Sequence, residues 1–374
     1  MKTEVIKKTN SLKILPKIIT NLKYKNPLIV TGRNSYEASS AKKIINKISS
    51  KTNVTRFSDF SINPRIEDAL KGAKIFHKNK CEYIISIGGG SVIDMGKLIN
   101  AFQAYQNREY KLVEGKIKIK KKLKYNIVIP TTAGTGSEAT HFAVCYINKK
   151  KYSLASKKLF SQLVIIDPLL MKSMSRYLAA SSAFDALSQS IESMWSVNST
   201  KKSINFASIS IKIILKNIEK SVNEKNFNSL KMMAEAAYYS GKAINITKTT
   251  APHALSYSIA SELDIAHGHS VAIILGYFFE INYYSTNLSS GMRQKKLSKI
   301  MNKIFTLMKV KSPEEAKREW FLKMKKCGLE SNIFKYESLT KRKINKIISS
   351  VNIERLLNHP IILTKKDLNK LFEK

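Results

Sequence analysis

Acidic residues are scarce in this chain of 374 residues. It has 27 Asp and Glu against 65 Lys and Arg, which gives a formal net charge of +38. Such an excess is typical of proteins that bind nucleic acids or anionic membranes. Here, however, the lysines are spread from end to end, no nucleic-acid-binding motif accompanies them, and Ile and Asn are abundant too, as a compositional bias produces. We therefore expect a basic surface that attracts small anions, and no nucleic-acid partner.

Cysteines and long apolar runs are also few. Cys81, Cys145 and Cys327 show no CxxC spacing, which argues against a disulfide framework and fits a reducing compartment. No run of about 18 uncharged apolar residues occurs, so we expect no membrane span and no membrane partner. The first residues, MKTEVIKKTNSLK, lack the apolar segment of a signal peptide. These features predict a cytoplasmic protein.

The first half of the sequence alternates short apolar runs with helical patterns. This β-α-β-α order is typical of a doubly wound parallel sheet. Five runs are predicted to be strands: 27–31, 54–57, 83–87, 127–130 and 164–166.

From residue 171 onward the patterns are helical, and Gly and Pro become sparse. We therefore predict an α/β nucleotide-binding domain over residues 1–168 and an all-α domain over residues 169–374. Eight helices are expected in the second part: 178–197, 200–222, 226–246, 249–262, 270–285, 292–309, 313–327 and 340–349.

Three consecutive glycines, Gly88 to Gly90, follow the predicted strand 83–87 and precede a helix that starts at Ser91. Glycines here let the backbone approach a phosphate, and the helix N-terminus offers free N–H groups and the positive end of its dipole. The pattern is not the usual GxGxxG. Asp94 and Lys97 follow within two helical turns, so they are able to face the same ligand.

A second loop, PTTAGTGSE at 130–138, follows the strand 127–130 and holds four hydroxyls, two glycines and one carboxylate. Ligands of open α/β sheets bind at the carboxyl ends of the strands. A dinucleotide is the natural occupant of two such loops, with its pyrophosphate on one and its ribose and nicotinamide on the other.

Three of the six histidines lie close together, at His253, His267 and His269. Asp264 and Gly268 bracket His267, so we expect the helix to break between the first two histidines. Converging imidazoles indicate a transition-metal site.

Asp185 and Gln189 are four residues apart, so one helix face carries both, and both offer oxygen ligands. Each feature taken alone has a simpler explanation. The histidines are then close in sequence by chance, and Asp185 is an ordinary carboxylate near a helix N-terminus with a polar neighbour.

Taken in order, these motifs resemble the iron-containing (group III) alcohol dehydrogenases, which are related to dehydroquinate synthase and glycerol dehydrogenase. The resemblance covers about residues 27 to 285 and is carried by GGGSVIDMGK, PTTAGTGSE, FDALSQSIES and two histidines 14 residues apart, the second followed by Gly. It implies a dehydroquinate synthase-like nucleotide-binding domain, a helical metal-binding domain and an active site in the cleft. Family members are often homodimers or larger homo-oligomers.

The resemblance implies one divalent metal, Fe²⁺ or Zn²⁺, on Asp185, Gln189, His253 and His267. The family usually has His at position 189, and an amide oxygen is a weaker ligand, so the metal stays open and His269 is a candidate substitute. At position 257 many members have a His near the nicotinamide. Tyr257 and His269 are therefore candidate catalytic proton donors, with packing the alternative for Tyr257.

The resemblance also implies a set of cofactor-binding residues. The run Val30–Asn34 lacks the carboxylate that often accepts from the ribose 2′-OH and has Arg33 instead, which favours NADPH over NADH. The implied cofactor-binding residues are Gly32, Gly88, Gly89, Gly90, Ser91, Asp94, Thr131, Thr132, Thr135, Ser137 and Leu178.

The implied reaction is reversible hydride transfer that reduces a small aldehyde to a primary alcohol. Segments 141–155 and 240–257 are similar to a subgroup of phosphonate biosynthesis that reduces phosphonoacetaldehyde to 2-hydroxyethylphosphonate. Lys151, Lys242 and Lys248 are candidate contacts for such an anion. The alternatives are a general short-chain or sugar-derived alcohol dehydrogenase, a dehydroquinate synthase-like lyase, and a nucleic-acid-binding protein built on an inactive dehydrogenase.

Overall fold

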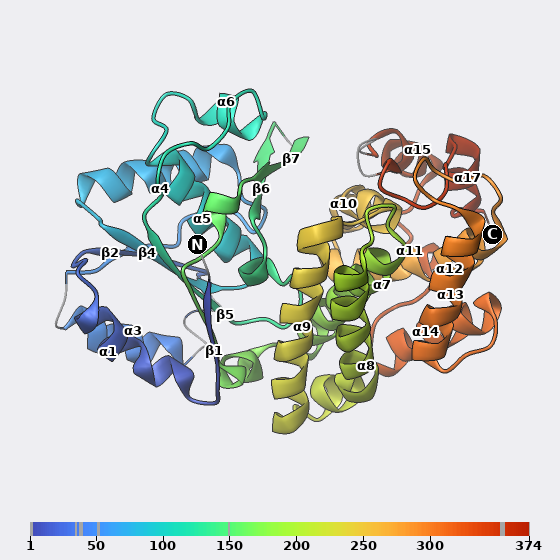
Figure 1. The fold of residues 1–374 in the computed structure, drawn as a ribbon, viewed down its shortest axis with the longest axis horizontal. Coiled ribbons are helices and arrows are strands. Elements are labelled where there is room, and N and C mark those ends of the chain that lie inside the picture. The colour runs from blue at the N-terminus through green and yellow to red at the C-terminus, as the bar shows by residue number, and fades with distance from the viewer. Residues whose placement is uncertain are drawn as a thin grey trace. The chain divides into compact units, whose positions relative to one another are not determined.

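The computed structural model describes residues 3–33, 36, 40–50, 53–148, 150–351 and 356–373. Asn34, which belongs to the run used to predict the cofactor preference, lies outside these residues. The chain divides into two compact units: Met1–Thr132 with Gly136–Ser173, and Ala133–Thr135 with Met174–Lys374 (Figure 1).

The first unit is built on a six-stranded sheet in which every neighbouring pair is parallel. Its central strands are buried along their whole length, as expected where helices cover both faces. The strand order is β1-β8-β5-β4-β2-β3, with β1 at Glu4–Lys7, β2 at Pro27–Thr31, β3 at Thr55–Phe57, β4 at Tyr83–Gly88, β5 at Tyr125–Pro130 and β8 at Leu163–Ile166.

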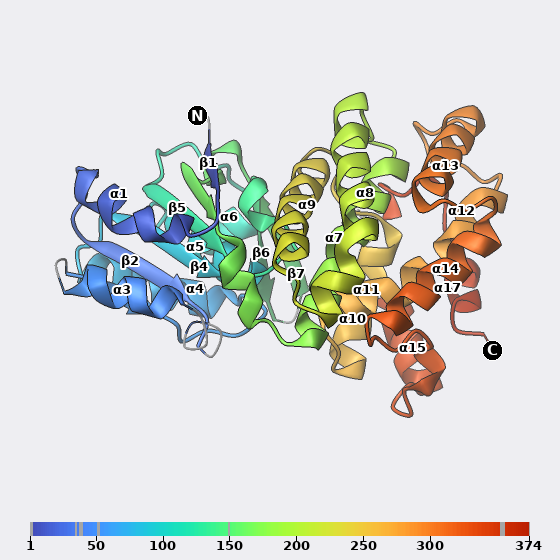
Figure 2. The ribbon, with the colours of Figure 1, turned by 90° about the horizontal axis from the view of Figure 1, so that it is seen from below.

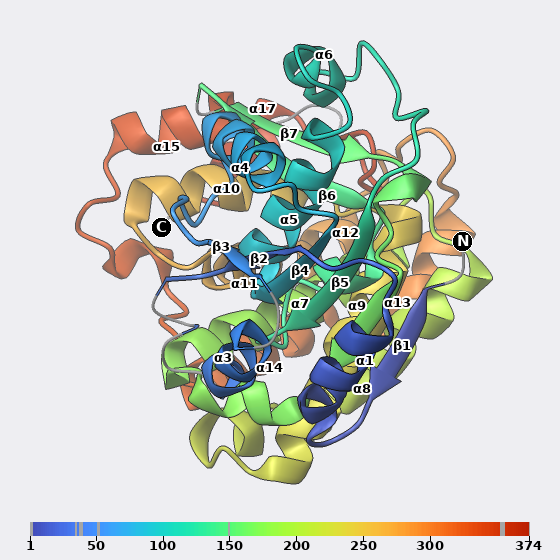
Figure 3. The same ribbon diagram turned by 90° about the vertical axis from the view of Figure 1, so that its left-hand side faces the viewer.

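Helices lie on both faces of this sheet (Figure 3). One face packs against α4 (Ile66–Lys78) and α5 (Gly90–Phe102), and the other against α1 (Leu15–Asn21) and α3 (Ala41–Ser49). A short helix, α6, spans Glu109–Val113, and a two-stranded antiparallel hairpin joins β6 (Phe142–Ile147) to β7 (Lys150–Ala155). The predicted nucleotide-binding α/β architecture is therefore confirmed.

The second unit is helical in its described part, as predicted. Its centre is α7, which is buried almost continuously from Ala179 to Trp195 and packs beside α8 and α9 (Figure 2). The expected helix 270–285 is two helices, since α11 ends at Leu275 and α12 begins at Phe278. The helices are α7 (Arg176–Trp195), α8 (Lys201–Asn223), α9 (Phe227–Thr247), α10 (Ala251–Leu263), α11 (His267–Leu275), α12 (Phe278–Tyr284), α13 (Gln294–Met308), α14 (Pro313–Lys326), α15 (Lys341–Ser349) and α17 (Lys365–Lys370).

Among the described residues, we find no helix with the length and apolar character that a bilayer crossing requires.

His359 is buried in the second unit between the rings of Trp195 and Phe278. Neither of its ring nitrogens has a hydrogen-bond partner among the described residues, and burial lowers its pKa from 6.5 to about 3. At pH values between about 3 and 6.5, His359 is therefore protonated in the unfolded chain and neutral in the folded chain. Stability is then lost as the pH falls below the unfolded pKa.

We expect this histidine to cost about 2 kcal/mol of folding stability at about pH 5 relative to neutral pH. In His359→Phe that loss is expected to disappear, which urea unfolding at the two pH values will measure. Replacing the exposed His77 with Gln is the matched control and should keep the wild-type loss. An unchanged pH dependence in His359→Phe would contradict the prediction.

Candidate metal centre and cofactor loops

Three of the predicted metal ligands converge in the second unit. Asp185 on α7, His253 on α10 and His267 on α11 each offer one ligand atom, and these atoms lie within 4.8 Å of one another. The Asp185 Oδ1 atom is 3.2 Å from His253 Nε2 and 4.0 Å from His267 Nε2. Asp185 and His253 are buried, whereas the His267 side chain is 37% exposed, so the cluster is reachable from the side of His267.

The predicted helix break between the histidines brings His267 back beside His253. Helix α10 ends at Leu263, the next residue Asp264 takes a left-handed conformation with φ of 51°, and α11 begins at His267. The two imidazole centroids are 5.4 Å apart. Gly268 makes the close packing of α11 on α7 possible, because a Cβ atom there would lie 2.0 Å from the Ser181 carbonyl oxygen and 2.8 Å from Asp185 Cβ.

Glu192 is a candidate site residue that was not predicted from the sequence. Its fully buried carboxylate accepts hydrogen bonds from His253 Nδ1 and from the backbone N–H and hydroxyl of Thr250. A carboxylate on Nδ1 leaves Nε2 as the nitrogen with the free lone pair, as in carboxylate–histidine–metal arrangements. The available signal was its position, about two helical turns after Asp185 on the same face.

The charges around His253 suit a cation. Burial opposes its protonation, but the carboxylates of Glu192 and Asp185 outweigh burial and raise the pKa of His253 to about 8. In the absence of a cation, the raised pKa keeps a proton on Nε2 that is shared with Asp185 Oδ1 at 3.2 Å, and a metal ion would replace this proton between the two atoms. Two imidazole nitrogens and one carboxylate oxygen match the preferences of Fe²⁺ and Zn²⁺, so these residues fit the implied metal.

The fourth predicted ligand is arranged differently. The Gln189 amide donates through Nε2 to Asp185 Oδ1 at 3.2 Å, and its Oε1 accepts from the Ser240 hydroxyl at 2.8 Å. Its oxygen therefore points at Ser240, away from the carboxylate.

The two candidate proton donors lie in different surroundings. The ring of Tyr257 lies parallel to that of His267, with centroids 5.1 Å apart and an interplanar angle of 3°. His269 is buried, and its Nδ1 faces the Tyr177 hydroxyl at 3.1 Å while its Nε2 faces the Glu330 carbonyl oxygen at 2.7 Å. Burial lowers the pKa of His269, so a neutral ring that donates to Glu330 and accepts from Tyr177 accounts for both contacts.

In the first unit, the two glycine-containing loops lie side by side at the carboxyl ends of β4 and β5. The Thr131 N–H donates to the Gly88 carbonyl at 3.0 Å, and a Cβ atom on Gly89 would lie 3.3 Å from the Thr132 side chain. A Cβ atom on Gly88 would lie 2.4 Å from Val92. Gly90 and Ser91 form the first residues of α5, where free N–H groups are able to receive a phosphate.

Asp94 and Lys97 point from α5 into the interior and hold the second loop. The fully buried Lys97 ammonium donates to the carbonyl oxygens of Ser137, Thr140 and Phe142 at 2.7 to 3.0 Å. Asp94 accepts from the Ser137 hydroxyl and the Val144 N–H. Burial lowers the pKa of Lys97 to about 8 and raises that of Asp94.

Two predicted cofactor residues belong to the second unit. Leu178, on the first turn of α7, is 40% exposed. Thr135 follows Gly134, where a Cβ atom would come within 2.9 Å of the Ser182 carbonyl oxygen, so this part of the loop packs tightly on α7.

At the end of β2, Arg33 pairs with Asp59. A second arginine contacts the end of this strand. The Arg56 guanidinium donates to the Gly32 carbonyl at 3.4 Å and to the Thr31 hydroxyl at 2.9 Å.

The three candidate anion-binding lysines differ in their placement. The Lys242 ammonium lies over the Phe206 ring, 4.1 Å from its centroid, on the side of α9 that faces α8. Lys248 is exposed at the C-terminus of α9, just before the helix that carries His253. Lys151 lies on β7 in the first unit, where its charge helps to lower the pKa of Asp94 against the larger effect of burial.

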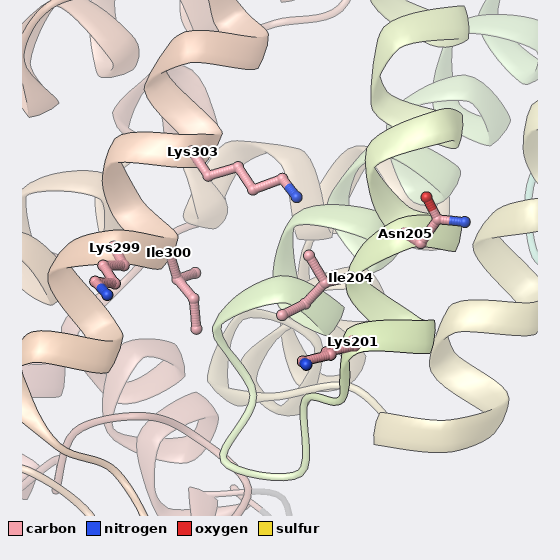
Figure 4. Close-up of a pocket in the computed structure, with 6 residues that line it drawn as sticks. All are labelled: Lys201, Ile204, Asn205, Lys299, Ile300 and Lys303. Carbon is pink, nitrogen blue, oxygen red and sulfur yellow. The ribbon is translucent and has the colours of Figure 1, made fainter.

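A separate depression of about 410 Å³ lies between α8 and α13 (Figure 4). It contains none of the predicted site residues. Its lining is Lys201, Ile204, Asn205, Lys299, Ile300 and Lys303, without a carboxylate or an imidazole.

Comparison with known proteins identifies the family of this chain. The sequence profile of iron-containing alcohol dehydrogenases matches residues 2–168, and that of the C-terminal region of the Fe-containing alcohol dehydrogenase family matches residues 179–374. Long-chain-alcohol dehydrogenase 1 of Geobacillus thermodenitrificans is 30% identical over 224 residues, which are 59% of this chain and 57% of that protein. Phosphonoacetaldehyde reductase of Streptomyces viridochromogenes is 31% identical over 160 residues, which are 42% of this chain and 40% of that protein.

Solved structures extend the similarity to nearly the whole chain. Sulfoacetaldehyde reductase from Bifidobacterium kashiwanohense, solved in complex with NAD⁺, superposes with a TM-score of 0.86 and 25% identity, over 99% of this chain and 96% of that one. An iron-containing alcohol dehydrogenase superposes with a TM-score of 0.83 at the same identity. Since the two family profiles together match most of the sequence, the chain belongs to the iron-containing alcohol dehydrogenase family.

Proposed function

We propose that this protein is an oxidoreductase that reduces a small aldehyde to a primary alcohol with NAD(P)H and one divalent metal, Fe²⁺ or Zn²⁺. The observation that carries the proposal is the cluster of Asp185, His253 and His267, whose ligand atoms lie within 4.8 Å of one another. The two loops after β4 and β5 supply the matching dinucleotide site.

Different residues of this chain would have different roles in the reaction. When bound, the metal would polarise the aldehyde carbonyl as a Lewis acid while the nicotinamide carries the hydride. Glu192 holds His253 in the tautomer that presents Nε2, and Asp185 contributes negative charge. The backbone of Gly88 to Gly90 would hold the pyrophosphate.

For proton delivery to the alcohol oxygen, Tyr257 is the stronger candidate. Its ring stacks on His267, whereas both nitrogens of His269 are engaged by Tyr177 and the Glu330 carbonyl. Among the cofactor loop residues, Thr131, Thr132, Thr135 and Ser137 would line the ribose and nicotinamide.

We further propose phosphonoacetaldehyde as the substrate and 2-hydroxyethylphosphonate as the product. Two of the similar proteins are named as reductases of phosphonoacetaldehyde and sulfoacetaldehyde, both two-carbon aldehydes with an acidic head group. The net charge of +38 favours an anionic substrate. Of the three candidate lysines, Lys248 is placed closest in sequence to the helix that carries His253, and Lys242 is the weakest because its ammonium lies on Phe206.

Steady-state kinetics with phosphonoacetaldehyde, sulfoacetaldehyde, lactaldehyde and butanal test the substrate. We expect kcat/KM for phosphonoacetaldehyde to exceed that for the uncharged aldehydes by at least about tenfold, since an ionic contact contributes about 1.5 to 3 kcal/mol. Lys248→Gln should remove part of that preference, and Lys242→Gln, on the same helix, is the matched control. Equal rates on the uncharged aldehydes would favour a general short-chain alcohol dehydrogenase.

For the cofactor, we propose a preference for NADPH. Arg33 follows β2, Arg56 reaches from β3 to Thr31 and Gly32 at the end of β2, and the nearby Asp59 carboxylate is neutralised by Arg33 and Lys71. We expect kcat/KM for NADPH to exceed that for NADH, and Arg56→Gln to reduce the difference. A clear preference for NADH would reject this part of the proposal, and the absence of NAD(P)H consumption would point to a lyase.

We also propose a domain boundary near residue 168 and a cytoplasmic homodimer or larger homo-oligomer. The first family profile ends at residue 168, which supports the boundary. Sedimentation of the purified full chain would test the oligomeric state, and a monomer at micromolar concentration would reject it.

A further inference from the structure

We propose that Gln189 is a positioning residue that orients Asp185, and that the protein supplies three metal ligands, Asp185, His253 and His267. This inference rests on the proposed function, because it assumes that a divalent metal binds at this cluster.

The contacts of Gln189 define its role. It lies one helical turn after Asp185 on α7, and its Nε2 donates to Asp185 Oδ1 at 3.2 Å. On the other side, its Oε1 accepts from the Ser240 hydroxyl of α9 at 2.8 Å. Both Gln189 and Ser240 are buried, so neither amide atom exchanges these partners for bulk water. The amide is therefore held at both ends.

The reverse orientation of the amide is less favourable. Before a metal binds, turning it over would place Oε1 3.2 Å from Asp185 Oδ1, where the present structure has Nε2, and two oxygens would face each other without a proton. It would also remove a hydrogen bond to an ionised acceptor, which is about twice as strong as a neutral one. To serve as a ligand, Gln189 would have to give up this bond to Asp185.

Rotating the Gln189 amide so that its oxygen faces the metal would gain little metal affinity. A neutral amide oxygen is a poorer ligand than imidazole or carboxylate for Fe²⁺ and Zn²⁺, whose sites are built from His, Cys and carboxylates. Three protein ligands with a further position open to substrate are, in contrast, the usual arrangement of catalytic zinc sites. By donating to Oδ1, Gln189 fixes the carboxylate atom that also lies nearest to His253 and His267.

Binding of Co²⁺ to the full chain tests the inference without any activity measurement. The visible absorption of bound Co²⁺ reports the number and kind of its ligands, and competition with a chelator gives its dissociation constant. The variants are Gln189→Ala and Gln189→Leu, neither of which is able to ligate or donate, and Gln189→His, which offers a fourth ligand.

We expect wild type, Gln189→Ala and Gln189→Leu to share one Co²⁺ spectrum, with affinity about tenfold weaker in the two variants because Asp185 loses its donor. Gln189→His should shift the spectrum and bind more tightly. Ser240→Ala should keep the wild-type spectrum with a smaller loss of affinity. Ser190→Ala is the matched control, since this buried hydroxyl on α7 bonds only its own helix at Ala186 and should leave both quantities unchanged.

A Co²⁺ spectrum that changes in Gln189→Ala and Gln189→Leu, as for the loss of one ligand, would overturn the inference and leave the proposed function intact. Wild-type protein that binds no Co²⁺ would overturn both.

Discussion

Replacing Asp185 with asparagine is expected to lower kcat/KM for aldehyde reduction by about 10³-fold or more and to remove most of the bound metal. The substitution keeps the shape of the side chain but removes the negative charge that faces His253 and His267 at 3.2 and 4.0 Å. A bound metal supplies several kcal/mol of transition-state stabilisation, and each 1.36 kcal/mol corresponds to about a tenfold change in rate. Metal content and steady-state kinetics measure the two effects.

The matched control is Asp264→Asn, the same chemical change at the exposed end of the helix that carries His253. Asp264 has a φ of 51°, a conformation that asparagine tolerates well, so we expect wild-type activity and metal content. Full activity in Asp185→Asn would exclude this carboxylate as a ligand.

Replacing Glu192 with glutamine is expected to weaken metal binding by about 10- to 100-fold, as substitutions behind metal-bound histidines do. The amide NH₂ group would face His253 Nδ1 and favour the tautomer with its proton on Nε2, where the metal needs a lone pair. Because the buried hydrogen bond between His253 Nδ1 and the carboxylate is lost, we expect a loss of about 1 to 3 kcal/mol of folding stability as well.

Chelator competition and urea unfolding separate these two effects of Glu192→Gln. Glu262→Gln, on α10 with His253 but paired with Lys346 near the surface, is the matched control and should change neither quantity appreciably. Wild-type metal affinity in Glu192→Gln would show that this carboxylate does not orient His253.

Much of the fold was predictable because its signals are local. Three of the predicted parallel strands, β2, β4 and β8, are apolar runs in which both faces are buried, and the helices of the second unit follow amphipathic patterns bounded by clear capping residues such as Thr200. The break at Gly276 and Tyr277, between α11 and α12, was not predicted because the apolar pattern continues across it.

Two elements of the first unit escaped prediction for physical reasons. Strand β1 has only four residues, Glu4–Lys7, two of them charged, and depends on pairing with β8, which is about 160 residues away in the chain. In the hairpin, burial alternates along β6, but its sequence FAVCYI has no alternation of polar and apolar residues, and β7 has one buried residue, Leu154. Long-range pairing of this kind leaves little trace in a single sequence.

At the candidate site too, the contacts between distant segments were the part that could not be predicted. The resemblance to the iron-containing alcohol dehydrogenases implied Asp185, His253 and His267 as ligands, and they converge in the structure. The orientation of Gln189 was not predictable, since it depends on Ser240, 51 residues away on another helix. The sequence likewise does not indicate that His269 is held by the Glu330 carbonyl, a contact across 61 residues.

The proposed metal-dependent aldehyde reduction is tested most directly by the metal dependence of NAD(P)H oxidation with phosphonoacetaldehyde and the uncharged aldehydes. The full chain would be stripped of metal with a chelator, assayed, and assayed again after anaerobic addition of Fe²⁺ or Zn²⁺. We expect negligible turnover without metal and recovery of turnover when one metal ion binds per chain. Equal aldehyde reduction by the metal-free and the metal-loaded protein would contradict it.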